Sequence, residues 1–139
     1  MATNCYEPQD LMAPKASGSF KADGMAIIPC SMKTLAGLAN AYSENLLLRA
    51  ADVTLKERRP LVIVPREMPL HSIHLSHMLT LSRMGVTIMV PSPAFYFKPK
   101  TLPEIIDFVV DKTLAVFGIE CHLYKCWGEV KEEHAGDYI

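Results

Sequence analysis

The sequence has no strong excess of charge of either sign. Its 139 residues carry 14 Lys and Arg against 15 Asp and Glu, which gives a net charge of −1 at pH 7. Without a basic surplus there is no electrostatic basis for binding nucleic acid or an anionic membrane, and we expect neither partner. No apolar run approaches the roughly 20 residues that a helix needs to cross a bilayer. These absences, with 50% apolar residues, are typical of an ordinary globular protein of one domain's length.

The marks of a secreted protein are also missing. The first seven residues lack the basic segment followed by an apolar one that defines a signal peptide. The four cysteines, at positions 5, 30, 121 and 126, form no CxxC pair and do not indicate a disulfide framework. We therefore expect a cytoplasmic location.

From residue 25 onward, apolar runs alternate with helical patterns. Strands are predicted at 25–29, 61–65 and 86–90, and helices at 45–57, 71–84 and 101 to about 117. A further helix is predicted to begin after Ser31, a suitable N-cap. Thr101 and Glu104 have the spacing of a capping box, and Gly85 and Gly118 are expected to end helices. Strands that alternate with helices predict an α/β fold with three layers and a mainly parallel sheet.

The predicted elements do not fill the chain evenly. Residues 1–23 are polar and broken by proline and glycine, so we expect a loop-rich lead-in, with 120–139 as a tail, in a single domain over 1–139. Three strands are few for a sheet that must be covered on both faces. The chain is therefore interpreted as the C-terminal portion of a larger α/β domain, or as one piece of a tight oligomer.

An adjacent cation and anion, Arg66 and Glu67, follow the second predicted strand. Ligands of parallel α/β sheets bind just beyond the carboxyl ends of the strands. Arg66 therefore lies where an anionic ligand is expected, and Glu67 where an acid/base group is expected. A surface ion pair is an equally supported interpretation, because such pairs are common.

Three weaker patterns allow a functional and a structural interpretation. Hydroxyl groups at Ser31 and Thr34, at a strand-to-helix junction, suit an anion or a polar ring edge, although an ordinary helix cap is favoured. Residues 16–20 form a small-residue loop that a ligand could approach closely, or a plain turn. Arg49 and Lys56 lie seven apart on one helix face and form either a phosphate clamp or a solvated basic edge together with residues 57–59.

Three histidines, at 71, 74 and 77, are spaced three apart on a predicted helix. This stripe invites a metal interpretation, but zinc sites usually combine histidines four apart or ligands from separate elements. A partner-facing or solvated stripe is favoured, and no metal is expected.

These segments match a known family in order and spacing. The chain resembles the UbiX-type flavin prenyltransferases, also described as the small subunit of phenolic-acid decarboxylase systems. The resemblance covers nearly residues 5 to 120. It is carried by Ala16-Ser17-Gly18-Ser19-Phe20, Pro29-Cys30-Ser31-Met32-Lys33-Thr34-Leu35-Ala36, Arg49-Ala50-Ala51-Asp52-Val53, Leu55-Lys56-Glu57-Arg58-Arg59-Pro60-Leu61-Val62, Pro65-Arg66-Glu67, Pro93-Ala94-Phe95-Tyr96 and Phe117-Gly118-Ile119.

The resemblance implies a flavodoxin-like or Rossmann-like flavoprotein that works without metal. Members transfer a dimethylallyl group from dimethylallyl monophosphate to N5 of reduced FMN, and ring closure at C6 makes prenylated FMN. The product is passed to a UbiD-type decarboxylase. The family forms large homo-oligomers, reported as dodecamers, with sites shared between subunits.

The resemblance also implies roles for individual residues. Ser31, Met32, Lys33, Thr34 and Arg66 would bind FMN. Lys56, Arg49 and Glu67 would surround the leaving phosphate as the catalytic set. Tyr96 and Lys112 would hold the prenyl phosphate, where the family usually has Arg in place of Lys112, and Trp127 matches a tail Trp of relatives.

One family feature has no counterpart in the sequence. Members begin with a strand and a glycine-rich turn that receives the FMN phosphate, and nothing before Met25 matches them. The resemblance therefore implies a domain truncated at its N-terminus. The alternative functions are a catalytically inactive oligomeric fragment and a related FMN-dependent cysteine decarboxylase-like flavoprotein.

Overall fold

The computed structural model describes residues 4–124. The chain divides into two compact units, Met1–Pro91 and Ser92–Ile139, each of which is considered by itself. A single domain over 1–139 therefore stays a prediction. In the described part of the chain, no helix is long and apolar enough to cross a bilayer.

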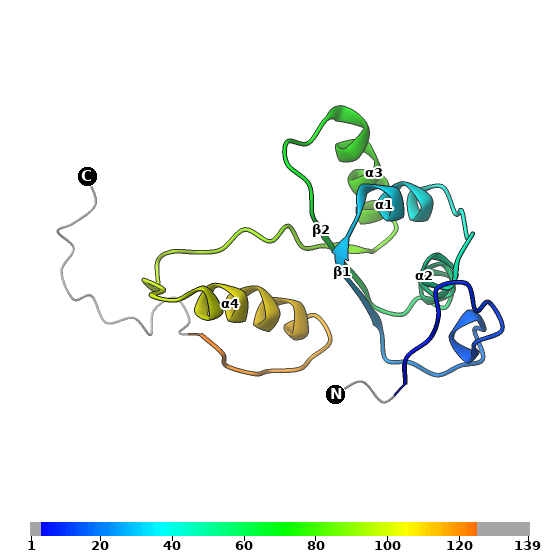
Figure 1. Ribbon diagram of the computed structural model, residues 1–139, viewed down its shortest axis with the longest axis horizontal. Coiled ribbons are helices and arrows are strands. Elements are labelled where there is room, and N and C mark those ends of the chain that lie inside the picture. The colour runs from blue at the N-terminus through cyan, green and yellow to red at the C-terminus, as the bar shows by residue number, and fades with distance from the viewer. Residues whose placement is uncertain (1–3, 125–139) are drawn as a thin grey trace. The chain divides into compact units, whose positions relative to one another are not determined.

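The first unit is a small parallel α/β structure (Figure 1). Its three strands are hydrogen-bonded in the order β1-β2-β3, and both strand pairs are parallel. The predicted α/β fold with a parallel sheet is confirmed. In chain order the elements are the 3₁₀ helix η1 (Pro14–Ala16), β1 (Met25–Cys30), α1 (Met32–Ala39), α2 (Leu46–Lys56), β2 (Leu61–Pro65), α3 (Ser72–Arg83) and β3 (Thr87–Ile88).

Side chains cap the starts of α1 and α2, and the first of these caps was predicted. The Ser31 hydroxyl accepts a hydrogen bond from the backbone N–H of Thr34 at 3.2 Å, which confirms Ser31 as the N-cap of α1. The Asn45 side chain does the same for α2, accepting from the N–H of Leu48 at 2.9 Å. Each cap satisfies one of the N–H groups that a helix leaves without a partner in its first turn.

The ends of α2 and α3 share one hydrogen-bond pattern. After α3, Gly85 has φ +91° and the N–H of Val86 donates to the carbonyl of Leu81, which confirms the predicted helix stop. After α2, Arg58 takes the corresponding left-handed conformation with φ 55°, and the N–H of Arg59 donates to the carbonyl of Thr54. This pattern usually has glycine at the left-handed position. Arg58 is therefore a strained residue that turns the chain sharply back toward β2.

The third strand is shorter than predicted. Residues 86–90 were expected to form it, but β3 covers only Thr87–Ile88. The N–H of Val86 is used in the cap of α3, where it donates to the carbonyl of Leu81. The N–H of Met89 still reaches the carbonyl of Ile63 at 2.9 Å, and Pro91, which has no N–H, follows soon after.

The core of the first unit lies between the sheet and its helices. All five residues of β2 are buried, whereas β1 leaves Ile28 half-exposed at the edge of the sheet. Helix α1 packs against α3, and α2 packs against η1 (Figure 1). The buried cluster consists of Ile27, Cys30, Leu35, Leu38, Leu48, Ala51, Leu61, Ile63, Met78, Leu81 and Val86.

The second unit is built on α4 (Leu102–Ala115). The Thr101 hydroxyl accepts from the N–H of Glu104, and the Glu104 carboxylate accepts from the Thr101 hydroxyl at 3.1 Å, so the predicted helix start is confirmed. Gly118 follows the helix with φ +72°, the left-handed conformation expected of it. The ring of Phe108 packs against the ring of Tyr124, with centroids 4.7 Å apart.

Candidate functional site

The first group of predicted site residues lies at the carboxyl ends of β1 and β2. The N–H of Arg66, which follows β2, donates to the carbonyl of Cys30, the last residue of β1, at 3.0 Å. Ser31 comes directly after Cys30, so the start of α1 and the Arg66–Glu67 pair are neighbours at one edge of the sheet. We call this the carboxyl-end group, consisting of Ser31, Met32, Lys33, Thr34, Arg66 and Glu67.

The start of α1 presents hydrogen-bonding groups at this edge. The hydroxyls of Ser31 and Thr34 are bonded to one another at 3.0 Å. The N–H groups of Met32 and Lys33 fall in the first turn, where the helix itself provides no acceptor. Together with the positive end of the helix dipole, these donors suit an anion or the acceptor atoms at a polar ring edge.

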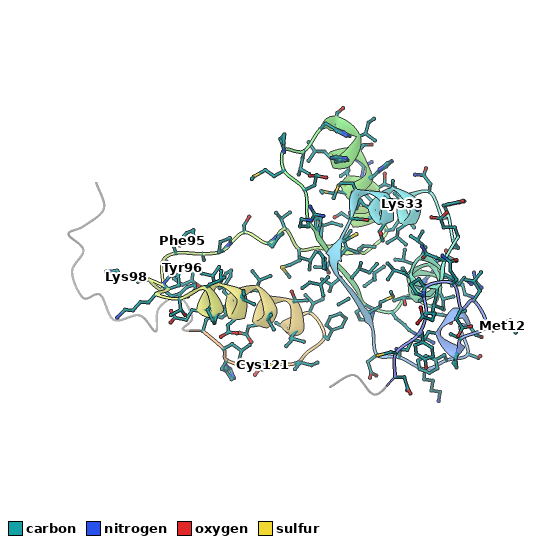
Figure 2. All side chains as sticks on the ribbon, in the orientation of Figure 1. Met12, Lys33, Phe95, Tyr96, Lys98 and Cys121 are labelled. Carbon is teal, nitrogen blue, oxygen red and sulfur yellow. The ribbon has the colours of Figure 1, made fainter. Side chains whose placement is uncertain are left out.

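The side chain of Lys33 points to a different partner. Its Nζ lies 2.8 Å from Glu44 Oε1, and it is labelled on α1 in Figure 2. The hydrogen bond between them raises the pKa of Lys33 and lowers the pKa of Glu44. Because the ammonium group is already paired, we expect Lys33 to serve a ligand through its backbone N–H.

Arg66 and Glu67 are both exposed at the carboxyl-end edge. They form no ion pair with each other in the described part of the chain, so the surface ion pair that the sequence also allowed is not present there. Glu67 Oε1 instead accepts from the N–H of Met68 at 3.1 Å. Both charges therefore remain available to a ligand beyond the strand ends.

The second group of predicted site residues lies on α2, with Arg49 in its first half and Lys56 at its end. Arg49 donates from Nε to the carbonyl of Ala16 at 3.1 Å, and its Nη1 lies 3.2 Å from Asp52 Oδ2. Lys56, the last residue of α2, pairs with Glu57 at 3.4 Å and keeps about half of its side chain exposed. With Arg59 and the loop of residues 16–20, these residues form what we call the amino-end group.

The loop of residues 16–20 lies directly against the end of α2. A Cβ added at Gly18 would collide with Glu57 Oε1 and would lie 3.4 Å from Lys56 Nζ. The hydroxyls of Ser17 and Ser19, on either side, are bonded to each other at 2.8 Å. The loop therefore lies in close contact with the side chains at the end of α2.

The cations at the end of α2 and the carboxyl-end group lie at opposite ends of β2. Lys56 and Arg59 precede β2, and Arg66 and Glu67 follow it. The five residues of β2, at about 3.3 Å each, separate them by roughly 16 Å. One chain thus brings Arg49 and Lys56 to the same helix and loop, and brings Ser31–Thr34 to Arg66 and Glu67. It does not bring Lys56 next to Glu67.

Tyr96 and Lys112 belong to the second unit. Tyr96 lies in the loop before α4 (Figure 2). Its ring packs edge-to-face on Phe97, with centroids 5.7 Å apart. Lys112 is on α4, with its Nζ 6.0 Å from the ring centre of Phe108 and 5.7 Å from that of Tyr124. Their predicted contact with a prenyl phosphate stays a prediction, and Trp127 lies outside the described residues.

The histidine stripe has a local role. The Nδ1 of His71 accepts from the N–H of His74 at 3.4 Å and so caps α3. The two rings stack with centroids 3.5 Å apart. Within residues 4–124, no group of three or more His, Cys, Asp or Glu side chains is arranged to hold a metal ion.

Sequence reasoning missed Arg59, which had been assigned only to a solvated basic edge. The structure makes it a half-buried residue whose guanidinium binds two loop carbonyls, those of Gly18 and Phe20. No local pattern signals such a contact, because its partners are 39 and 41 residues away in the sequence.

Comparisons with known proteins agree with this architecture. Residues 3–114 match the model of the flavoprotein family. The flavin prenyltransferase UbiX of Methanocaldococcus jannaschii is 54% identical over 130 residues, which cover 94% of this chain and 71% of the relative. The corresponding protein of Halalkalibacterium halodurans is 56% identical over 130 residues, which cover 94% of this chain and 63% of the relative.

Two solved structures have the same fold. A dodecameric FMN-dependent UbiX-like decarboxylase from Escherichia coli O157:H7 is 54% identical with a TM-score of 0.86, over 88% of this chain and 66% of that one. AnUbiX (PadA1), in complex with FMN and dimethylallyl pyrophosphate, is 45% identical with a TM-score of 0.89, over 91% and 67%. The chain thus spans about two thirds of the length of these relatives, and it belongs to the flavoprotein family and, within it, to the UbiX-type flavin prenyltransferases.

Proposed function

We propose that this protein is a flavin prenyltransferase, which moves a dimethylallyl group from dimethylallyl phosphate to reduced FMN and makes prenylated FMN. The observation that carries the proposal is its likeness to AnUbiX, whose structure contains FMN and dimethylallyl pyrophosphate, at 45% identity and a TM-score of 0.89. In the reaction the allylic C–O bond of the donor breaks, a bond from that carbon to the flavin forms, and the phosphate leaves with the electron pair.

The carboxyl-end group is the proposed flavin site. The hydroxyls of Ser31 and Thr34 and the N–H groups of Met32 and Lys33 would bind the polar edge of the ring system, and Arg66 would bind an anionic part of FMN. When bound in its reduced form, the flavin supplies the nucleophilic nitrogen. Glu67, exposed beside it, would accept or return a proton as the transfer proceeds.

The amino-end group is the proposed phosphate site. Lys56 supplies an ammonium group and Arg49 a guanidinium group at one helix and loop. Fixed cations stabilise the negative charge that grows on the phosphate as the C–O bond breaks. Tyr96 and Lys112 are proposed to bind the prenyl phosphate.

We further propose that each site combines the carboxyl-end group of one copy with the amino-end group of another. The roughly 16 Å between the two groups in a single chain supports this arrangement, and so does the dodecameric state of the E. coli relative. Exposed apolar side chains at Met68, Ile73 and Leu79 follow Arg66 and Glu67 in the sequence, and no Lys, Arg, Asp or Glu occurs in residues 68–82. An uncharged apolar surface suits contact with a second copy.

The product is proposed to serve a UbiD-type decarboxylase in the cytoplasm. The decarboxylase would accept prenylated FMN directly, and neither nucleic acid nor a membrane would bind this protein. The near-neutral net charge of −1 supports the absence of both.

Anaerobic turnover with the purified chain tests the proposal. The protein is incubated with FMN, a chemical reductant and dimethylallyl phosphate, and the flavin is then analysed by mass spectrometry. We expect a flavin heavier by one dimethylallyl group, with an equal amount of inorganic phosphate released. A parallel reaction with dimethylallyl pyrophosphate identifies the preferred donor. An assembled protein that binds FMN but leaves it unmodified with both donors contradicts the proposal and supports the inactive oligomeric fragment.

A further inference from the structure

We propose that Arg59 is a positioning residue that holds the loop of residues 16–20 against the end of α2 and thereby fixes Lys56. The inference rests on the proposed function for its catalytic meaning, but its structural basis is independent. Arg59 donates from Nη1 to the carbonyl of Phe20 at 2.7 Å and from Nη2 to the carbonyl of Gly18 at 2.9 Å. One planar fork thus joins two carbonyls of the same loop.

The position of Arg59 is itself fixed by the end of α2. Its N–H donates to the carbonyl of Thr54 at 2.9 Å, and the left-handed Arg58 before it, with φ 55°, reverses the chain direction. The guanidinium therefore starts from a defined backbone position, and little side-chain freedom is lost when its two hydrogen bonds form.

The loop that Arg59 holds in turn limits where Lys56 can go. Gly18 is packed against Glu57 so closely that a Cβ there would collide with Glu57 Oε1. The same Glu57 oxygen lies 3.4 Å from Lys56 Nζ. Arg59 therefore acts on Lys56 through two successive contacts. Gly18 of the loop contacts the Glu57 carboxylate, and that carboxylate pairs with the Lys56 ammonium group.

Arginine is needed at this position because of its shape. Lysine keeps the charge but offers a compact ammonium group in place of a planar fork, so it cannot bond both carbonyls in the same geometry. Arg58 provides a matched control, because it is adjacent, carries the same charge and is exposed. Substituting it removes the same charge and leaves the loop contacts in place.

Hydrogen exchange of the loop amides tests the structural part. The N–H groups of Ser17, Ser19 and Phe20 are bonded within residues 14–20. In Arg59→Ala we expect them to exchange at least about tenfold faster, because two hydrogen bonds to a charged group are lost. Arg59→Lys should fall between Arg59→Ala and wild type, and Arg58→Ala should match wild type. Unchanged exchange in Arg59→Ala overturns the inference whether or not the protein has activity.

Kinetics tests the link to Lys56. In Arg59→Ala and Arg59→Lys we expect the KM for dimethylallyl phosphate to rise about tenfold or more with the KM for FMN unchanged, a split that general destabilisation does not produce. Faster loop exchange with an unchanged donor KM overturns the positioning role. If the wild-type protein transfers no prenyl group, the proposed function fails, and the affinity for dimethylallyl phosphate measured by calorimetry takes the place of KM. Equal affinity in wild type and Arg59→Ala, or no binding by either, overturns the role.

Discussion

Co-expression of two inactive variants distinguishes a site shared between copies from a site within one chain. The variants are Lys56→Ala, in the amino-end group, and Glu67→Gln, in the carboxyl-end group. Both side chains are exposed, so neither change should alter the core. Each variant alone is expected to lose about 100-fold or more in kcat, the usual effect of removing one charge-stabilising or proton-transferring group.

The expected recovery follows from the distance between the groups. Lys56 and Glu67 lie at opposite ends of β2, roughly 16 Å apart along the backbone, and in the proposed arrangement each working site takes its two groups from different copies. In an equal, random mixture half of the copies have an intact carboxyl-end group and half an intact amino-end group. About a quarter of the sites are then intact, and we expect about a quarter of wild-type activity.

The control is a double variant, Lys56→Ala with Glu67→Gln, co-expressed with wild type. Shared sites predict about a quarter of wild-type activity in this mixture also. If both groups belong to one site within a single chain, the double-variant mixture keeps about half of the activity and the mixture of single variants regains none. Activity is measured on purified mixed oligomers by phosphate release, with the ratio of the two chains determined by intact-mass spectrometry. Recovery absent from the single-variant mixture would refute the reasoning.

Three further predictions concern stability and reactivity. Arg58→Gly should raise the free energy of unfolding by about 0.5–1 kcal/mol, because glycine adopts the left-handed conformation without strain, which outweighs the greater entropy of the unfolded chain. A lower urea midpoint would count against the cap geometry. Gly37→Ala should lower the free energy of unfolding by about 1 kcal/mol, because the new Cβ would lie 2.9 Å from a methyl group of buried Leu48. This overpacking outweighs the gain in helix propensity. A higher urea midpoint for Gly37→Ala would contradict the prediction. Burial raises the pKa of Cys30 from 9.0 to about 11. Its thiolate fraction at pH 8 should therefore be about a hundredfold below that of a thiol with a pKa of 9.0. Iodoacetamide should accordingly label the exposed Cys5 before the buried Cys30. The neutral buried thiol favours the folded state below pH 9, and this stabilisation should be lost as pH rises toward 11, whereas a Cys30→Ala variant should lack that part of the alkaline decline.

Local features of the fold could be predicted because they depend on neighbouring residues. A hydroxyl that caps a helix needs only the N–H three residues later, so Ser31 and Thr101 were identified correctly from sequence. Gly85 and Gly118 were identified as helix ends for the same reason, since the left-handed conformation favours glycine. The third strand was predicted too long because the N–H of Val86 is used in the cap of α3 and Pro91 has no N–H, so few residues between them can pair with β2.

The arrangement of the candidate site depends on contacts between distant parts of the chain. Sequence spacing placed Arg49 and Lys56 on one helix face, but it gave no reason to join either to residues 16–20. The role of Arg59 depends on carbonyl groups that any residue could provide, so no side-chain pattern marks it. The distance between Lys56 and Glu67, by contrast, follows from the strand between them, which the structure has at the predicted residues 61–65.

A crystal structure of the oligomer with FMN and dimethylallyl phosphate tests the central claim most directly. We expect the flavin ring to lie against Ser31–Thr34 of one copy and the donor phosphate to lie within hydrogen-bonding distance of Lys56 Nζ from a neighbouring copy. A phosphate bound far from every Lys56, or held together with the flavin entirely by residues of one copy, would contradict the account.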